Sequence, residues 1–354
     1  MAATPMKLAL DNSWSGGQYS LFRVALGTYW LGYFLLPWWH GVNPPAGTAV
    51  VRVACVVSAL LLCVGVWDGV AAGALLGFVL LALIRGDGRE ALSLACLGWL
   101  SLAHLLLPRA PYGSWVARGR IDPAGSWRMS PRLFALGWVV LSLAYAYAGY
   151  GQLQAARRLD GSALVYAFEL SFAPLALFRR ARPWIWCGGL VLQLVTLARF
   201  GGVELSAGPL LLHLWTFDPG WILPRRAGET ETIYYDGTCA LCHGFVRFVL
   251  AEDRGGAAFR FAPLQGQTLP PGLPDSVIVR SGEGTLLSRS DAVLHVLARL
   301  GGFWRAFGAI GRGVPRPLRD AAYDAIARLR YRVFGRKTEA CPVIPADLRS
   351  RFSI

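Results

Sequence analysis

Thr232-Ile-Tyr-Tyr-Asp-Gly-Thr-Cys-Ala-Leu-Cys242 is a β-branched and aromatic run that leads directly into a Cys-x-x-Cys motif. The run predicts a short strand at residues 232–235. Apolar residues then recur at helical spacing, which predicts a helix beginning near the first cysteine: Leu241, Phe245, Phe248 and Val249. The two cysteines are therefore expected at a strand-to-helix junction, facing the same way and within disulfide reach.

This position favours redox chemistry at the cysteine pair. Free backbone N–H groups and the helix dipole stabilise a thiolate at the first cysteine. A thiolate is the attacking species in thiol–disulfide exchange, so we predict that Cys239 is the nucleophile and Cys242 resolves the mixed disulfide. Asp236 has two interpretations of equal weight: it assists proton transfer to the buried thiol, or it is a turn or cap residue.

Three other interpretations of the motif are weaker. Cys239-Ala-Leu-Cys242-His243 fits the c-type haem attachment pattern, which is short and easily met by chance. A zinc site needs four ligands, and only His243 and Cys341 are available to join the pair, so no metal site is predicted. In the third interpretation, the two cysteines only pack in the core. The N-terminus of a helix stabilises a thiolate, which argues against this interpretation.

The residues after the motif complete the fold prediction. Strands are expected at 259–262 and 276–280, a hairpin turn at Ser281-Gly-Glu-Gly284 leads into a strand at 285–288, and an amphipathic helix covers 317–334. Ser290 is expected to cap a helix that runs to Leu300. The order of strand, Cys-x-x-Cys, helix, strand, hairpin and helices predicts an α/β thioredoxin-like domain.

Residues 233–342 resemble the DCC family of thiol–disulfide oxidoreductases, which is named for its Asp-x-x-Cys-x-x-Cys motif. The matching stretches are 235–242, 259–264, 290–294, 331–335 and Cys341-Pro342. The resemblance implies a thioredoxin-like fold and thiol–disulfide oxidoreductase activity. Ser290-Asp291 is similar to the glutaredoxin site that holds a peptide or glutathione terminus, although capping explains it equally well. Cys341 is either a third redox thiol or a packed residue.

The first two thirds of the chain lack the charge of a soluble domain. Of 354 residues, 55% are hydrophobic and 16% charged, against about 25% charged in an average soluble domain. Residues 1–226 carry 27 charges and the last 128 residues carry 29. Eight apolar runs, each near the roughly 20 residues that cross a bilayer, lie at 21–39, 53–67, 70–84, 91–107, 133–150, 163–178, 184–198 and 205–223.

These features predict a polytopic α-helical membrane domain with six to eight spans at residues 1–224. A linker at 225–231 and the thioredoxin-like domain at 232–354 follow it. With eight crossings, 11 Lys and Arg lie on the N-terminal side and six on the other, which predicts a multi-pass inner-membrane protein whose C-terminal domain is cytoplasmic. The first apolar run contains Arg23 and lacks a cleavage site, so no signal peptide is expected.

The expected partners are the lipid bilayer and a thiol or disulfide substrate, either a protein or a small molecule. The net charge of +14 is assigned to membrane-flanking arginines. No basic stripe with interleaved aromatic residues marks the soluble part, so no nucleic acid is expected.

Polar side chains inside the apolar runs are costly and are therefore candidate pocket residues: Arg23, His104, Gln152, Glu169, Gln193 and His213. Each lone histidine or glutamine is otherwise explained as a hydrogen bond between helices. Glu169 is the strongest candidate, because a carboxylate in lipid must pair, protonate or face water. Arg23 is its candidate partner.

Three stretches resemble the membrane domain of the vitamin K-dependent γ-carboxylase: 20–27, 145–153 and 213–219. The resemblance implies a shared architecture at about residues 10–224 and a pocket for a quinone or another lipid-like molecule. The catalytic lysine of the carboxylase corresponds to Gly151 or Gln152, and its His-Asn-His motif has only His104 as a counterpart. A glutamine cannot act as the amine base, so carboxylation by that mechanism is not expected.

The leading functional hypothesis is therefore a membrane-anchored thiol–disulfide oxidoreductase, coupled to a quinone or lipid-like molecule. In the alternative, the membrane domain catalyses a different reaction on a lipid or peptide, with Glu169 or a histidine as base. The thioredoxin-like domain would then recognise a partner. A third hypothesis is a non-enzymatic lipid-binding or assembly factor.

Overall fold

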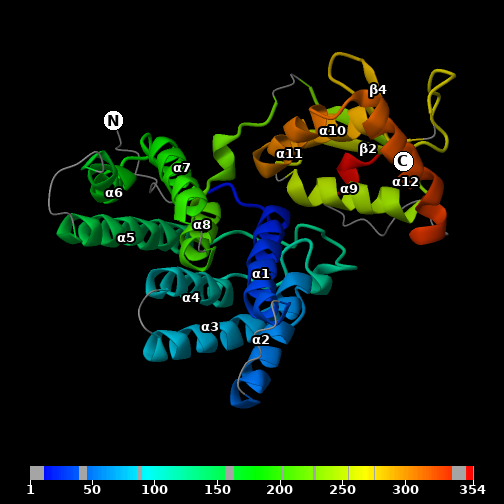
Figure 1. Ribbon diagram of the computed structural model, residues 1–354. Helices are drawn as coiled ribbons and strands as arrows, with labels where there is room; N and C mark the ends of the chain where they lie inside the picture. The colour runs from blue at the N-terminus through cyan, green and yellow to red at the C-terminus, as the bar shows by residue number, and fades with distance from the viewer. Residues whose placement is uncertain are drawn as a thin grey trace, which may run out of the picture.

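The computed structural model describes residues 12–39, 46–86, 90–155, 163–200, 203–225, 229–253, 255–274, 276–336 and 348–353. These residues are mostly helical, with one small mixed sheet in the C-terminal part (Figure 1). Cys341 lies outside the described residues, so its predicted redox role stays a prediction.

All eight apolar runs of the first part contain a helix. The bounds are α1 Gly16–Trp39, α2 Ala46–Val64, α3 Asp68–Arg85, α4 Ala91–Leu106, α5 Pro131–Ala155, α6 Ala163–Ala176, α7 Arg182–Phe200 and α8 Val203–Thr216. We call α1–α8 and their connections the helical region. Its last run leaves the α-helix at Thr216 and continues as a 3-10 turn at Pro219–Trp221.

Two of these helices, α3 and α5, are long and apolar enough to cross a membrane by length and composition. The predicted six to eight spans are therefore not confirmed. One reason is that some of the helices are too short to cross a bilayer. The 14 residues of α6 or of α8 extend about 21 Å, whereas the hydrocarbon core of a bilayer is about 30 Å thick.

Buried aromatic rings form much of the core of the helical region. Tyr19 on α1 is 1% exposed and stacks on Trp127 with ring centroids 5.0 Å apart. Gly208 brings α8 against α4, because its N–H donates to the Ser93 hydroxyl at 3.0 Å and a Cβ there would overlap the Ser93 backbone. Tight packing of rings and small residues thus ties the helices together.

The C-terminal sheet has the strand order β2-β1-β3-β4. The strands are β1 Glu231–Tyr235, β2 Phe259–Pro263, β3 Ile278–Arg280 and β4 Leu286–Ser288. β1 pairs in parallel with β2 and antiparallel with β3, which pairs antiparallel with β4. A parallel β-α-β unit followed by an antiparallel hairpin is the thioredoxin-like arrangement, so the predicted fold of this part is confirmed.

The helices of this part are α9 Ala240–Glu252, α10 Arg289–Leu300, α11 Gly302–Arg312 and α12 Arg316–Val333. α10 ends at Leu300 as predicted, but the prediction that Ser290 caps it is wrong. The helix begins at Arg289 with Ser288 as N-cap, because Ser288 still has extended backbone angles. Ser290 therefore lies inside the first turn.

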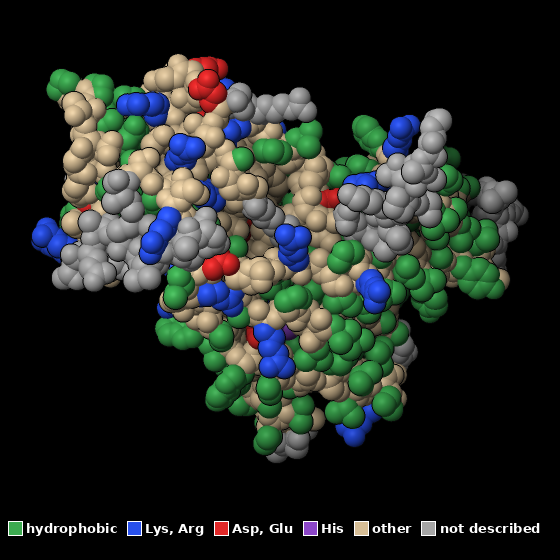
Figure 2. Space-filling model, turned by 180° about the vertical axis from the view of Figure 1, so that it is seen from behind, with side chains coloured by type: hydrophobic (Ala, Val, Ile, Leu, Met, Phe, Trp, Pro, Cys, Tyr) green, Lys and Arg blue, Asp and Glu red, His purple; other side chains and the backbone are tan. Residues whose placement is uncertain are grey.

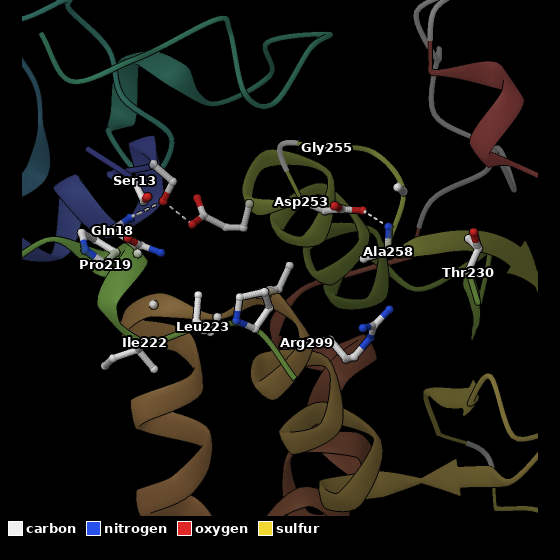
Figure 3. Close-up of a pocket in the computed structure, with 18 of the residues that line it drawn as sticks. Ser13, Gln18, Pro219, Ile222, Leu223, Thr230, Asp253, Gly255, Ala258 and Arg299 are labelled. Carbon is white, nitrogen blue, oxygen red and sulfur yellow. Dashed lines mark hydrogen bonds between the residues drawn. The ribbon is translucent and has the colours of Figure 1, made fainter. Parts of the chain in front are cut away.

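The C-terminal end of α9 docks on the start of α1 (Figure 1). Glu252, the last residue of α9, accepts a hydrogen bond from the Gly17 N–H at 3.0 Å, and others from the Ser15 hydroxyl and the Trp304 indole. A cavity of about 730 Å³ lies beside this contact, between the start of α1 and the end of α9; its lining includes Ser13, Gln18, Asp253 and Arg299 (Figure 3).

Candidate functional site

Cys239 is the N-cap of α9, at the end of the turn that follows β1. Its sulfur accepts a hydrogen bond from the Cys242 N–H, with 3.5 Å between the two atoms. The Cys242 thiol in turn interacts with the Cys239 side chain, and both cysteines are free. The structure thus places the two sulfurs next to each other at the start of a helix, where backbone N–H groups favour negative charge.

Both cysteines are buried, with Cys239 0% and Cys242 7% exposed. The segment after α12 covers the first of them. A single antiparallel β-bridge pairs Cys239 with Arg336, and the Ala240 N–H donates to the Gly335 carbonyl at 3.4 Å. Gly335-Arg336, which we call the cover, therefore pairs with the backbone at the start of α9.

The surroundings keep Cys242 protonated. Burial raises the pKa of its thiol to about 12, with further contributions from the hydrogen bond to Cys239 and from the charge of Cys239. The backbone of Asp236 and the charge of Arg330 oppose this rise. A thiol that stays neutral at physiological pH suits a residue that attacks only in the second step of an exchange.

Asp236 sits at the centre of a hydrogen-bond network beside the cysteines. Its Oδ1 accepts from the backbone N–H and the hydroxyl of Thr238, both at 2.9 Å, and from the Gln265 amide at 2.9 Å. Its Oδ2 accepts from the Tyr331 hydroxyl and from Arg330, at 3.4 Å. Asp236 thereby joins the turn before α9 to α12.

These bonds favour one of the two interpretations of Asp236. Burial alone raises the pKa of its carboxyl group, but hydrogen bonds from Tyr331, Thr238 and Gln265 outweigh burial and hold the pKa at about 2. A carboxylate that is stabilised this strongly is a poor proton acceptor. The geometry therefore favours a structural role in the turn over proton transfer.

His243 also supports the turn. It is 2% exposed, and its Nε2 donates to the Gly237 carbonyl at 2.7 Å, while its ring meets Tyr235 edge to face. A c-type haem would need this histidine as an axial ligand, which conflicts with the bond to Gly237. Within the described residues, no group of three or more His, Cys, Asp or Glu is placed to hold a metal ion.

Comparison with known proteins identifies this part of the chain. The family model described as DCC1-like thiol-disulfide oxidoreductase matches residues 233–336. The uncharacterized protein YuxK of Bacillus subtilis is 34% identical over 131 residues, which cover 93% of that protein and 34% of this chain. The chain belongs to the DCC1-like thiol-disulfide oxidoreductase family. We call its sheet-containing part the DCC1-like domain.

A more distant relative supports the same assignment. A chloroplastic DCC family protein of Arabidopsis thaliana is 28% identical over 117 residues, which cover 66% of that protein and 30% of this chain. No solved structure matches the chain. The family match starts at residue 233, so it assigns nothing to the helical region and does not show the predicted γ-carboxylase-like membrane domain.

Ser290 and Asp291 lie in the DCC1-like domain but are bonded to α12. The Ser290 hydroxyl donates to Asp320. Asp291 pairs with Arg319 at 2.6 Å and with Arg316 at 3.2 Å. These bonds use the groups that would hold a peptide or glutathione terminus, so the structure favours a role in helix packing.

The pocket candidates of the helical region fall into separate places. Arg23 is 0% exposed and donates to the carbonyls of Leu62 and of Cys63, the latter at 3.0 Å. Glu169 instead lies 3.5 Å from the Gln152 amide. The predicted pairing of Arg23 with Glu169 is therefore wrong, because Arg23 holds the end of α2.

The two histidines of the helical region that lie within the described residues each bond a tyrosine. His213 Nε2 lies 3.1 Å from the Tyr145 hydroxyl, and its Nδ1 donates to the Pro209 carbonyl at 3.0 Å. His104 Nδ1 lies 2.5 Å from the Tyr19 hydroxyl. Only His104 also contacts a carboxylate within the described part of this region, Asp68 at 3.5 Å.

The residues that reach the site from far along the chain were not predicted from the sequence. Arg330 and Tyr331 lie more than 90 positions from Asp236, and Glu252 joins α9 to α1. The stretch 331–335 carried part of the family resemblance, which was the available signal for Tyr331. Nothing in the local pattern marks Glu252, because a charged last residue is ordinary for a helix.

Proposed function

We propose that this protein is a membrane-anchored thiol–disulfide oxidoreductase that works through Cys239 and Cys242. The observation that carries the proposal is the position of Cys239 at the N-cap of α9, with its sulfur bonded to the Cys242 N–H. Membership of the DCC1-like family supports the reaction class. The substrate is a disulfide or a thiol. The cysteine geometry and the family membership give the reaction class but not the substrate molecule.

The proposed reaction has two steps. The Cys239 thiolate attacks one sulfur of a substrate disulfide, the substrate S–S bond breaks, and the released sulfur leaves as a thiolate that takes up a proton. Cys242 then loses its proton and attacks Cys239, which releases the second substrate thiol. Two electrons pass from the protein dithiol to the substrate, and a Cys239–Cys242 disulfide remains.

Membrane anchoring is supported by the surface of the helical region. Hydrophobic side chains gather over the lower and right-hand part of Figure 2. Large apolar side chains stand well exposed on several helices, among them Val50, Ile84, Leu164 and Trp184, each at least 77% exposed. Water penalises such a surface, whereas the interior of a bilayer does not.

We further propose that the exchange also runs in reverse, so that a substrate dithiol reduces the Cys239–Cys242 disulfide and a quinone in the bilayer then regenerates that disulfide. The quinone accepts two electrons and two protons from the Cys239–Cys242 dithiol and becomes a quinol, so two electrons pass from the substrate dithiol to the quinone and the cycle balances. The basis of this step is the tethering of the DCC1-like domain to an apolar helical region through Glu252 and α1.

The thiol chemistry is tested with three variants of the full-length chain. Cys239→Ser abolishes reduction of a model disulfide such as 5,5′-dithiobis(2-nitrobenzoate), whereas Cys242→Ser accumulates the mixed disulfide on Cys239, visible by mass spectrometry. Cys187→Ser is the matched control, because Cys187 is exposed on α7. Full turnover of Cys239→Ser would refute the proposed nucleophile.

The membrane proposal is tested by extraction. We expect the full-length chain in membranes from expressing cells to stay in the pellet after alkaline carbonate washing and to dissolve in detergent. Release into the carbonate supernatant would contradict anchoring. Quinone coupling is tested separately: reduced protein in liposomes should reoxidise without oxygen only when ubiquinone is included, and equal rates without quinone would refute that step.

A further inference from the structure

One side of α12 carries a stripe of apolar side chains. Four of them, each at least 50% exposed, recur along the helix: Leu318, Ile326, Leu329 and Val333. At about 3.6 residues per turn, these positions lie within about 80° of one another around the helix axis. The other side of α12 packs on the domain, where the Tyr323 hydroxyl accepts a hydrogen bond from the Val277 N–H at 2.9 Å. The stripe therefore faces away from the core of the domain.

Exposed apolar side chains of this size are confined to one part of the DCC1-like domain. Within its described residues, the well-exposed large apolar side chains all lie between positions 307 and 334: Phe307, Ile310, Val314, Leu318, Ile326, Leu329, Val333 and Phe334. A lone exposed leucine on a soluble domain is ordinary, whereas a stripe along one helix face marks an interaction surface. The outer side of α12 is therefore a candidate interaction surface.

Positive charge accompanies the stripe. From the start of α12 to the last residue described after it, the exposed charged residues are all arginines: Arg316, Arg328, Arg332 and Arg336. The two acidic residues of α12 are only partly exposed, and each pairs with an arginine: Asp320 with Arg316 at 3.4 Å and Asp324 with Arg289 at 3.1 Å. The outer side of α12 is therefore both apolar and positively charged.

We propose that the outer side of α12 lies on the anionic headgroups of the bilayer that holds the helical region. We call this surface the docking face; it consists of the four apolar residues of the stripe with Arg328 and Arg332. The inference rests on the membrane anchoring proposed above. An interfacial helix buries its apolar stripe at the boundary between headgroups and acyl chains, while its basic residues attract anionic lipids. Anchoring raises the local concentration of the domain at the membrane, so a short stripe suffices.

The charge of the docking face selects among its possible occupants. A second copy of α12 would bring arginines against arginines, and such like-charge contacts disfavour association. Anionic lipids supply the opposite charge. The planar guanidinium group also matches the phosphate of a headgroup, because it donates two parallel hydrogen bonds to it. An anionic lipid surface therefore satisfies both the apolar and the charged part of the docking face.

The docking face ends beside the cysteine pair. Val333 and Phe334, which are 66% and 51% exposed, lead directly into the cover, and Arg336 of the cover forms the β-bridge with Cys239. A domain that is docked through α12 therefore holds the cysteine end of α9 close to the lipid surface. This placement extends the proposed function, since it brings the dithiol near a reactant that is dissolved in the bilayer.

Photocrosslinking identifies the occupant of the docking face. p-Benzoylphenylalanine is incorporated in place of Ile326 in the full-length chain, which is reconstituted in nanodiscs of phosphatidylcholine and phosphatidylglycerol. We expect a lipid adduct on α12, detected by mass spectrometry after irradiation. The same probe in place of Leu80, 53% exposed on the candidate span α3, reports membrane anchoring by itself. In place of Glu283, in the exposed hairpin turn, it is the control that should gain no lipid.

The role of charge is tested with two matched pairs of substitutions. Arg328→Gln combined with Arg332→Gln should lower the yield of the lipid adduct at position 326 about fivefold or more. Arg260→Gln combined with Arg280→Gln removes two exposed arginines from the sheet and should leave the yield unchanged. Thermal unfolding should be the same for both doubly substituted chains, because all four side chains are exposed. Equal yields from the two pairs would contradict binding of headgroups by α12.

The two probe positions separate this inference from the proposed function. A lipid adduct at Leu80 without one at Ile326 would overturn the docking and leave the anchoring in place. No lipid adduct at either position would overturn both. A crosslinked dimer of the chain through Ile326 would show that a second copy covers α12, which also overturns the docking on lipid.

Discussion

The two ends of α9 are held by different parts of the molecule. At its start, Cys239 lies beneath Gly335-Arg336, which it meets through one β-bridge and one 3.4 Å hydrogen bond of its neighbour Ala240. At its end, about 20 Å away along the helix, Glu252 accepts three hydrogen bonds from buried or half-buried donors. The cysteine end meets Gly335-Arg336 through fewer bonds than those that join the far end to its partners.

Under the proposed function, this difference indicates how the buried Cys239 thiol could become accessible to a substrate. Displacing Gly335-Arg336 would remove one β-bridge and one hydrogen bond at the start of α9 and would leave the three hydrogen bonds of Glu252 in place. The contact at Glu252 joins the DCC1-like domain to α1. This helix lies outside the residues that match the family.

The largest effect is expected at the anchored end. Glu252→Ala leaves the Gly17 N–H, the Ser15 hydroxyl and the Trp304 indole without their acceptor and should cost about 3 kcal/mol of unfolding free energy. Thermal unfolding followed by tryptophan fluorescence measures the loss. Glu283→Ala, in the exposed hairpin turn, is the control. Equal melting temperatures for the two variants would mean that Glu252 is no anchor.

A smaller and pH-dependent effect is expected at the cysteine end. The pKa of Asp236 is about 2 in the folded protein, below the ordinary value of about 3.9, so its stabilisation is present above about pH 4 and disappears as the pH falls toward 2. Asp236→Asn should therefore melt at a lower temperature than the wild type at pH 6. Near pH 2 the two should melt together, and a pH-independent difference would contradict the assignment.

The cover itself is tested through its glycine. Gly335 has φ of +82°, so Gly335→Ala strains the covering segment by about 1 kcal/mol and should speed alkylation of Cys239 by iodoacetamide about fivefold. Gly266→Ala, at φ of +84°, introduces the same strain with nothing within 4 Å of the added Cβ. Peptide mapping by mass spectrometry gives the rate at Cys239. If both variants react alike, Gly335 does not control access.

The smallest effect is expected at α10. Ser290→Ala removes the hydrogen bond to Asp320 and should cost about 1 kcal/mol, whereas Ser288→Ala, at an N-cap without a side-chain cap bond, should cost less. Urea denaturation of the two variants compares them. A larger loss of unfolding free energy for Ser288→Ala would contradict the packing role of Ser290. It would indicate instead that the Ser288 side chain caps α10.

Local pattern predicted most of the DCC1-like domain correctly. The strand at residues 232–235 and the helix after Cys239 follow from periodicity and from the polar turn between them, which act over a few residues. Boundaries at α10 were missed, because Ser288 and Ser290 are equally good capping residues in sequence and only backbone geometry separates them. The number of spans stayed beyond sequence alone, since apolar runs predict helices but not what surrounds them.

By itself the sequence determined the cysteine spacing, the order of strands and helices, and the contrast between an apolar first part and a charged second part. Each of these depends on neighbours in the chain. Only the tertiary structure decided that Asp236 belongs to Tyr331 and Arg330, that Glu252 holds α1, and that Arg23 turns away from Glu169. Such pairings depend on packing between distant segments, where a charge takes whichever partner the fold brings within hydrogen-bond distance.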